Sequence, residues 1–274
     1  MIAARQIAFG KAAKKKEETP AYWGLCFTAE EAGSTVAMQA VGQGAPAVTL
    51  ETSFDGEIWE PFTVGETTIT LPNVGDKVYF RAGEGGNTAM ASSNKEYNKF
   101  SIITGRIAAS GNIMSLLNGD VPDSIIATYC YINMFEGCTS LVNAPKLPAT
   151  TMDVYCYVNM FKGCTSLVNA PELPATTMDA GCYTNMFNGC TSLAQAPELP
   201  ATTLATYCYN YMFKGCEKVS LISTRQTSFT GCTNWLSGVA QSGIFYCPTS
   251  LGTDETIARG GNACPEGWTV INKD

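Results

Sequence analysis

The sequence predicts an α+β chain of several domains, in which an antiparallel β-sandwich precedes a short solenoid of strand–helix repeats with a carboxy-terminal cap. Two observations predict this architecture. Residues 124–222 repeat one phrase at a constant period, which is typical of a solenoid whose units bury their apolar faces only against their neighbours. Residues 47–82 instead alternate apolar and polar side chains between turn dipeptides, which is typical of antiparallel strands.

The repeats come into register when Cys130, Cys156, Cys182 and Cys208 are aligned, each 26 residues after the last. Each of these cysteines opens a nonapeptide that ends in a second cysteine: CYINMFEGC, CYVNMFKGC, CYTNMFNGC and CYNYMFKGC. Close copies of TSLVNAPELPATTM follow the first three nonapeptides, whereas the segment after the fourth departs from this pattern. The repetition therefore indicates a structural role first.

Within one repeat, the spacing of apolar residues predicts an amphipathic helix. Cys156, Met160, Phe161 and Cys164 stand at i, i+4, i+5 and i+8, the stripe of one buried helix face. Threonines and an aspartate just upstream are typical N-cap residues, and Gly163 stands where a helix would end. The segment SLVNAPELP then predicts a strand of a few residues, because its prolines cannot donate ladder hydrogen bonds. One short strand and one short helix per unit indicate a coil of the leucine-rich-repeat type.

The phrase MFKGCTSLVNAPELPATTM resembles the BspA-like leucine-rich repeats of gut bacteria and of the tailed phages that infect them. The resemblance covers about residues 124–222. It implies a right-handed strand-and-helix solenoid with no chemistry of its own, in a family associated with adhesion and surface recognition.

The other segments divide the chain into further parts. Residues 21–109 have the size of an immunoglobulin-like or fibronectin-like β-sandwich, and residues 110–125 are expected to cap the first repeat. Residues 126–222 hold the repeats, and residues 223–274 hold a degenerate repeat, FTGCT, with a carboxy-terminal cap. Both ends of a solenoid need such shielding.

Residues 1–20 form a basic arm. They carry five cationic and two anionic side chains, a net charge of +3, which leaves −10 for residues 21–274 from the total of −7. We interpret the arm as an anchor in a larger assembly, because a short apolar segment outside a domain has little else to bury against. The plain alternative is a solvated arm, and nucleic-acid binding is not expected from lysines without interleaved aromatics. The candidate anchor residues are Ile7, Phe9, Lys14, Lys15 and Lys16.

Membrane insertion and secretion by the usual signal are not expected. Apolar stretches fall short of the ~20 residues that a membrane span needs. The amino terminus places its lysines after its short apolar stretch, whereas a secretory signal places them before it.

Cysteine and histidine usage argues against an enzyme. The chain has 12 cysteines and no histidine, so mechanisms that need an imidazole are excluded. Zinc and other metals or cofactors are not expected, since C-x2-C pairs are absent. Paired cysteines on a helix would lie about 12 Å apart, too far for a bridge. We predict a ladder of buried thiols suited to a reducing compartment, and leave a bridge between Cys247 and Cys264 open.

Positions that are predicted to be exposed and that differ between repeats indicate a recognition surface. The varying positions include Ile132, Val158, Thr184 and Asn210. Tyrosines next to the cysteines either pack their rings with the hydroxyl in water or form an exposed aromatic strip, and packing is the favoured interpretation. The candidate recognition residues are Tyr131, Tyr157, Tyr183, Tyr209, Lys162, Asn188, Lys214, Glu172 and Glu198.

Together these features predict a non-enzymatic adhesion or receptor-recognition protein. The favoured setting is a virion assembled in the host cytoplasm, with the chain in a tail or head fibre. The expected partners are a host cell-surface glycan or protein and, through the arm, other virion proteins; a homo-oligomer such as a trimer stays open. The alternatives are a BspA-like adhesin on a bacterial cell surface and a purely structural decoration protein of the virion.

Overall fold

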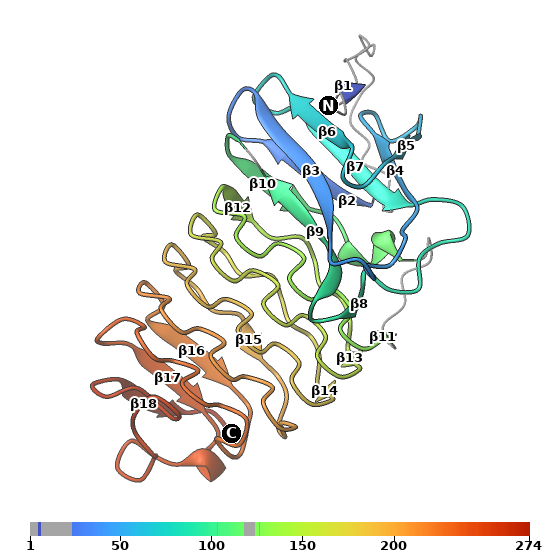
Figure 1. The fold of residues 1–274 in the computed structure, drawn as a ribbon. Helices are drawn as coiled ribbons and strands as arrows, with labels where there is room; N and C mark the ends of the chain where they lie inside the picture. Colours follow the sequence, from blue (N-terminus) through green and yellow to red (C-terminus); the bar gives the residue numbers. More distant parts are fainter. Residues whose placement is uncertain (1–4, 7–23, 103, 118–123, 126) are drawn as a thin grey trace.

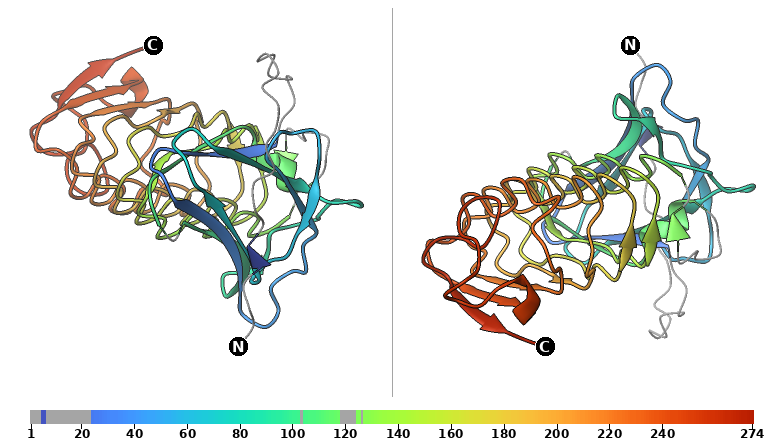
Figure 2. Two further views of the ribbon diagram at one scale, coloured as in Figure 1. Left: turned by 90° about the horizontal axis from the view of Figure 1, so that it is seen from above. Right: turned by 90° about the horizontal axis from the view of Figure 1, so that it is seen from below.

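A computed structural model shows two sheets at one end of the molecule and a β-solenoid that extends away from them (Figure 1). Views from above and below show the coils of the solenoid side by side, with the amino-terminal sheets at one end and the last strands at the other (Figure 2). The structure describes residues 5–6, 24–102, 104–117, 124–125 and 127–274. Within these ranges the regular elements are β-strands and two short 3-10 helices, and none is an α-helix.

The first sheet has five strands in the order β1 (Arg5–Gln6), β6 (Thr67–Leu71), β3 (Ser34–Val41), β9 (Glu96–Ile102) and β8 (Ala91–Ser93). The second has six strands in the order β12 (Leu141–Asn143), β10 (Ile107–Ser110), β2 (Leu25–Ala29), β7 (Lys77–Ala82), β4 (Leu50–Ser53) and β5 (Glu60–Phe62). Pairing is antiparallel except where β1 joins β6 and β12 joins β10. The rings of Phe27, Phe80 and Phe100 meet edge to face between the sheets.

The strands predicted from alternation are present as β4, β5, β6 and β7, but the predicted immunoglobulin- or fibronectin-like β-sandwich is not supported. The six-stranded sheet takes its edge strand β12 from the first repeat. Phe100 stacks on Phe135 of that repeat, with ring centroids 5.4 Å apart and an interplanar angle of 10°. Most buried apolar residues of the sheets and of the repeats belong to one hydrophobic cluster. Burial therefore continues from the sheets into the solenoid, and the sheets do not close into a separate module.

The solenoid makes about five turns, which we call coils. Its short parallel strands fall into two sheets. One contains β11 (Ser124–Ile125), β13 (Thr151–Met152) and β14 (Thr177–Met178), and the other contains β15 (Glu198–Leu199), β16 (Leu221–Thr224), β17 (Ile244–Cys247) and β18 (Thr269–Asn272). The predictions of an α+β fold, of strand–helix units and of a leucine-rich-repeat coil are therefore wrong.

The segment predicted to be helical is a run of tight turns with alternating backbone handedness. Tyr155, Tyr157 and Asn159 all have φ between 53° and 59°, a left-handed region that an α-helix excludes. The Met160 amide donates to the Tyr157 carbonyl, three residues back, at 3.3 Å. The next amide, that of Phe161, donates instead to the Met186 carbonyl in the following coil at 2.9 Å. Alternate amides thus close turns and link coils. Buried residues recur in pairs every four residues, a period that mimics the apolar stripe of a helix.

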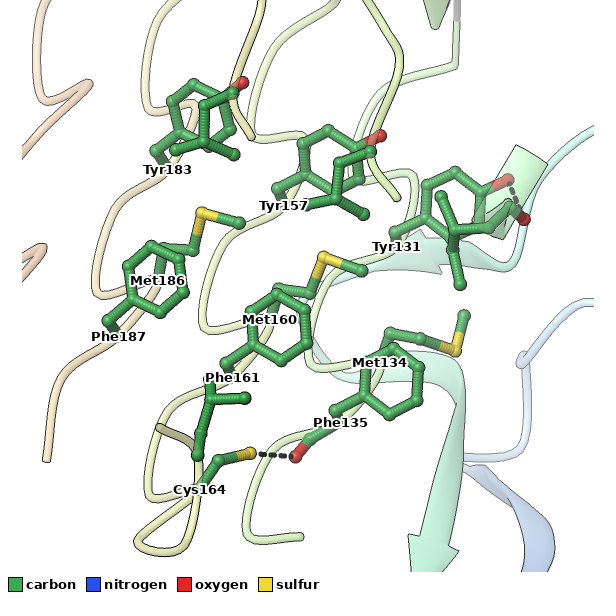
Figure 3. Close-up of a cluster of buried hydrophobic side chains, with 14 of the residues drawn as sticks. Tyr131, Met134, Phe135, Tyr157, Met160, Phe161, Cys164, Tyr183, Met186 and Phe187 are labelled. Atoms are coloured by element: carbon green, nitrogen blue, oxygen red, sulfur yellow. Dashed lines mark hydrogen bonds between the residues drawn. The ribbon is translucent and has the colours of Figure 1, made fainter. Parts of the chain in front are cut away.

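Identical side chains stack through the solenoid core (Figure 3). The rings of Phe135, Phe161, Phe187 and Phe213 lie parallel at centroid distances of 5.4, 5.7 and 5.5 Å. Rows of tyrosines and methionines run beside them. The solenoid core is therefore built from stacked identical side chains, whereas the core between the sheets is built from unlike side chains that interdigitate. Each coil covers the core of the next.

The predicted cysteine ladder is confirmed. The thiols of Cys164, Cys190 and Cys216 donate to the Phe135, Phe161 and Phe187 carbonyls of the preceding coils at 3.0–3.1 Å. The 12 cysteines are buried and none forms a disulfide, Cys247 and Cys264 included. Because the segment is not helical, the helical rise used to judge bridges within a repeat does not apply. Burial raises the pKa of the Cys216 thiol to about 12, so the ladder is protonated at neutral pH.

Both ends of the solenoid are covered. At the first coil, the Tyr131 hydroxyl donates to the Ile113 carbonyl of the 3-10 helix η1 (Ile113–Leu116) at 3.0 Å. At the last coil, Asp254 accepts a hydrogen bond from the Val270 amide of β18 at 2.9 Å. Arg259 donates to the Trp268 carbonyl at 2.7 Å and pairs with Asp254 at 2.8 Å. These side chains, near the 3-10 helix η2 (Thr249–Leu251), occupy backbone groups of the edge strand that could otherwise pair with another chain.

Candidate functional site

The predicted tyrosine row lies inside the solenoid and not on its surface. Tyr131, Tyr157, Tyr183 and Tyr209 are at most 1% exposed, and successive rings are 5.7–6.4 Å apart. The favoured packing interpretation is confirmed for the rings, whereas the hydroxyls are not in water. The hydroxyls of Tyr157, Tyr183 and Tyr209 have no hydrogen-bond partner among the described residues. Burial raises their pKa values well above the usual range.

The varying positions are less exposed than predicted. Ile132 is buried with Ala91 and Tyr97 against the β8–β9 hairpin. Asn210 is 7% exposed and accepts a hydrogen bond from the Thr233 amide at 2.8 Å. Val158 and Thr184 are half-buried. Ile132 and Val158 pack in the cluster with the hairpin, and Thr184 and Asn210 bond to the following coil. Differences between repeats therefore do not by themselves mark a free surface.

The row that contains Lys162, Asn188 and Lys214 lies on the surface. Backbone bonds from Gly137, Gly163 and Gly189 to the carbonyls of these residues, all 2.8 Å, hold the row in register from coil to coil.

The side chains of this row contact their own surface neighbours. The Lys162 ammonium pairs with Glu136 at 3.1 Å, and the Asn188 amide donates to Asn185 at 2.8 Å. The Lys214 ammonium lies 5.4 Å from the centre of the Tyr211 ring. Glu136 thus pairs the charge of Lys162, whereas the exposed Lys214 ammonium keeps its charge beside the Tyr211 ring.

The structure brings Glu172 and Glu198 together on another face. They line a groove of about 390 Å³ between two successive coils. Both carboxylates are exposed, the buried Leu173 lies between the coils, and Arg225 approaches Glu198 at 3.5 Å. The other lining residues are Ala170, Pro171, Pro174, Pro197 and Pro200. Rigid proline rings and two carboxylates in register can bind an extended polar ligand.

The sequence interpretation missed an outer tyrosine row, which lies two residues before the buried one. Tyr129 and Tyr155 stack at 5.1 Å with an interplanar angle of 11°, and Tyr207 is 54% exposed. Gly181 takes the equivalent position in the third coil. A signal was present: the second tyrosine of Tyr-Cys-Tyr is constant in the four nonapeptides, whereas the first changes to glycine. Of these two tyrosine positions, the constant one lies in the core and the tyrosines of the varying one are half-buried or exposed.

The candidate anchor residues Ile7, Phe9, Lys14, Lys15 and Lys16 lie outside the described residues. Of the arm, only β1 is described, and it pairs with Thr67 and Thr68 at the edge of β6. Among the described residues, none of the helices is long and apolar enough to cross a membrane. In the same part of the chain, histidine, cysteine, aspartate and glutamate side chains form no group of three or more that could hold a metal ion.

Comparison of the chain with protein-family models, with curated proteins and with solved structures finds no match. The resemblance to BspA-like repeats therefore remains a prediction, and the functional argument depends on the surface of the solenoid.

Proposed function

We propose that the chain is a non-enzymatic adhesion or receptor-recognition protein that presents its solenoid surface to a host cell. The observation that carries the proposal is the groove beside Glu172 and Glu198, which a constant core builds from two coils in register. The core residues repeat from coil to coil, whereas Lys162, Asn188 and Lys214 differ at one surface position. The absence of histidine from the chain supports a non-enzymatic role.

The favoured setting is a tail or head fibre of a virion. This setting comes from the resemblance to repeats in phages of gut bacteria, and it makes a host surface glycan or protein the partner. The basic arm would then contact other virion proteins. A bacterial surface adhesin would use the same solenoid face, whereas a decoration protein would bind only its own virion.

Cell binding tests the proposal. Fluorescently labelled protein is added to whole gut-bacterial cells, with and without prior removal of their capsular polysaccharide. Saturable binding to at least one strain is expected. Absence of binding to every strain would contradict the recognition proposal and favour the decoration protein.

A charge-reversal pair tests the groove. The double variant Glu172→Lys with Glu198→Lys should weaken cell binding about tenfold or more, because it inverts the charge of the groove. The matched control is Glu30→Lys with Glu31→Lys, which changes the net charge equally at an exposed turn of the amino-terminal sheets. Equal loss in both double variants would indicate a general charge effect and exclude the groove as the binding site.

A further inference from the structure

The groove beside Glu172 and Glu198 is rich in hydrogen-bond acceptors and poor in donors. Four of its eight lining residues are prolines, which have no amide N–H to donate. Its two charged lining residues are glutamates, and an ionised carboxylate only accepts hydrogen bonds. A ligand that fills the groove must therefore supply the donors itself, which favours a cation over an anion.

The core of the solenoid positions both carboxylates. Glu172 is exposed between the buried residues Pro171 and Leu173, and Glu198 is exposed beside the buried Leu199 of β15. The two glutamates stand 26 residues apart, at equivalent positions of successive repeats. Core rings at equivalent positions lie 5.4–5.7 Å apart from coil to coil. The groove thus presents two acceptors that follow each other along the solenoid.

The charge of this pair is only partly neutralised. Arg225 approaches Glu198 at 3.5 Å, but the two side chains are 68% and 61% exposed, so solvent screens the pair. Within the part of the chain that the structure describes, the Glu172 carboxylate forms no ion pair. The equivalent residue of the first repeat is Lys146, so the acidic part of this row is limited to two coils.

A lysine or arginine side chain has the chemistry that fits the groove. Its methylene stem packs on apolar surface and leaves the charged head at the rim, where it donates charge-assisted hydrogen bonds to carboxylates. An amino sugar carries the same charge, but the acceptor oxygens of its hydroxyls would face prolines that have no N–H. In an extended peptide, side chains two residues apart lie on one side at roughly 7 Å. Two such cations can therefore reach the two carboxylates.

We infer that the groove at Glu172 and Glu198 binds an extended cationic segment of a cell-surface protein, with one lysine or arginine on each carboxylate. At Glu198, the ligand displaces Arg225. The inference rests on the proposed recognition function, because it names the partner of the same groove and selects a protein over a glycan.

Two variants with opposite expected effects test the groove. Glu172→Gln with Glu198→Gln removes both charges and keeps the shape of the side chains. Arg225→Met removes the competing cation. The matched control is Glu30→Gln with Glu31→Gln, which changes the net charge equally at an exposed turn of the amino-terminal sheets. Thermal unfolding of every variant is compared with that of the wild type.

The main probe is the peptide acetyl-Ala-Lys-Ala-Lys-Ala-amide, with binding followed by NMR titration at low ionic strength. The same peptide with norleucine in place of lysine keeps the stems and lacks the charges. The methyl glycoside of glucosamine represents an amino sugar. Wild-type protein is expected to bind the lysine peptide about tenfold more tightly than either other probe. The Glu172→Gln, Glu198→Gln variant should bind it about tenfold more weakly, Arg225→Met about twofold more tightly, and the control as the wild type does.

Several results would overturn the inference. Absence of binding to the lysine peptide would remove the site. Equal binding of the lysine and norleucine peptides would show that charge is not recognised. Equal affinity in the wild type and the folded Glu172→Gln, Glu198→Gln variant would place any binding elsewhere. Unchanged affinity in Arg225→Met would remove Glu198 from the ligand contact, and tighter binding of the glycoside would replace the protein partner by a glycan.

The peptide titration distinguishes the inference from the function on which it rests, because it is measured without cells. Wild-type protein that binds cells but not the lysine peptide leaves recognition standing and removes the cationic partner. Protein that binds the peptide through the groove but binds no cell supports the site and contradicts the proposed adhesion. Where both bind, protease treatment of the cells should abolish cell binding; binding that survives the protease and is lost with the capsule would overturn the choice of a protein partner.

Discussion

The amino-terminal sheets and the solenoid bury similar side chains through different contacts. In the sheets, unlike positions meet at steep angles, as where Phe27 and Phe80 lie 5.6 Å apart at 88°. In the solenoid, each ring meets its own copy, as where Phe161 and Phe187 lie 5.7 Å apart at 6°. A side chain of the solenoid therefore supports two neighbouring coils at once. Because the repeats align equivalent residues, these core side chains of the solenoid also form contacts between coils.

The largest expected effect comes from breaking one ring stack. Phe161→Ala should cost about 3–5 kcal/mol in the free energy of unfolding, because it leaves a cavity between Phe135 and Phe187. Phe80→Ala should cost a similar amount in the sheets. The two variants should differ in hydrogen exchange, since Phe161→Ala should deprotect amides in both adjacent coils and Phe80→Ala should not. Unchanged protection of those coils in Phe161→Ala would contradict the stacking argument.

Alkaline pH should sharpen the comparison, because the thiols are divided unevenly between the two regions. Cys26 lies in the sheets, and the other 11 cysteines follow in the solenoid and its caps. Burial raises the pKa of Cys182 and Cys216 from 9.0 to about 12. A raised folded-state pKa means that the stabilisation is complete below pH 9 and is lost as the pH rises toward 12.

The urea midpoint should therefore fall steadily between pH 9 and 11. Replacing Cys182 and Cys216 together by alanine should reduce this fall, whereas Cys26→Ala should leave it close to that of the wild type. For each variant, the change in urea midpoint is measured relative to its own midpoint at pH 7.5. This reference separates the effect of thiol titration from the effect of lost packing. A midpoint independent of pH would show that the thiols are not shielded from solvent.

The sequence predicted the strands of the sheets better than it predicted the repeats. Alternation with period two has few competing interpretations, and β4, β6 and β7 follow it. Buried pairs every four residues fit both a helix and a run of alternating turns. Asn159 and Gly163, which tolerate positive φ, were the residues that could have decided between them.

The candidate site was predicted only in part, for a related reason. Glu172 and Glu198 came to one groove because a solenoid aligns equivalent positions whatever its secondary structure. Packing of the inner tyrosine rings was predicted, but their hydroxyls were expected in water and the outer tyrosine row was missed, because the helical interpretation gave the wrong side-chain directions in this segment. Tyr155 and Tyr157 both have φ of 59°, yet one is half-buried and the other fully buried.

A smaller effect is expected at the hydroxyls of the buried tyrosines. Tyr131→Phe should destabilise the protein by about 1 kcal/mol, because it removes the hydrogen bond to Ile113 at the contact between the first coil and η1. Tyr157→Phe should be neutral or stabilising by about 1 kcal/mol, since its hydroxyl is buried without a partner among the described residues. Urea denaturation of both variants measures the difference. Equal destabilisation would show that the Tyr157 hydroxyl has a bound partner, such as an internal water.

The smallest effect is expected at two ion pairs with nearly equal exposure. Lys162 and Glu136 in the solenoid are 43% and 27% exposed, and Arg81 and Glu51 in the sheets are 44% and 27% exposed. A double-mutant cycle with Lys162→Met and Glu136→Gln should give a coupling energy below about 0.5 kcal/mol, because solvent screens such a pair.

The corresponding cycle in the sheets should give more, because Arg81 is held in place on its other side. Its guanidinium lies 4.0 Å from the centre of the Trp59 ring, and it donates to Glu51 at 2.8 Å from Nε and 2.7 Å from Nη2. A guanidinium already ordered by an aromatic face loses less entropy when it binds a carboxylate. We expect a coupling energy of about 1 kcal/mol for Arg81→Met with Glu51→Gln. Equal coupling in both cycles would mean that the aromatic contact adds no order. The larger coupling energy expected in the sheets depends on an arginine that contacts both an aromatic ring and a carboxylate. Such combinations of unlike side chains are less frequent where identical coils stack.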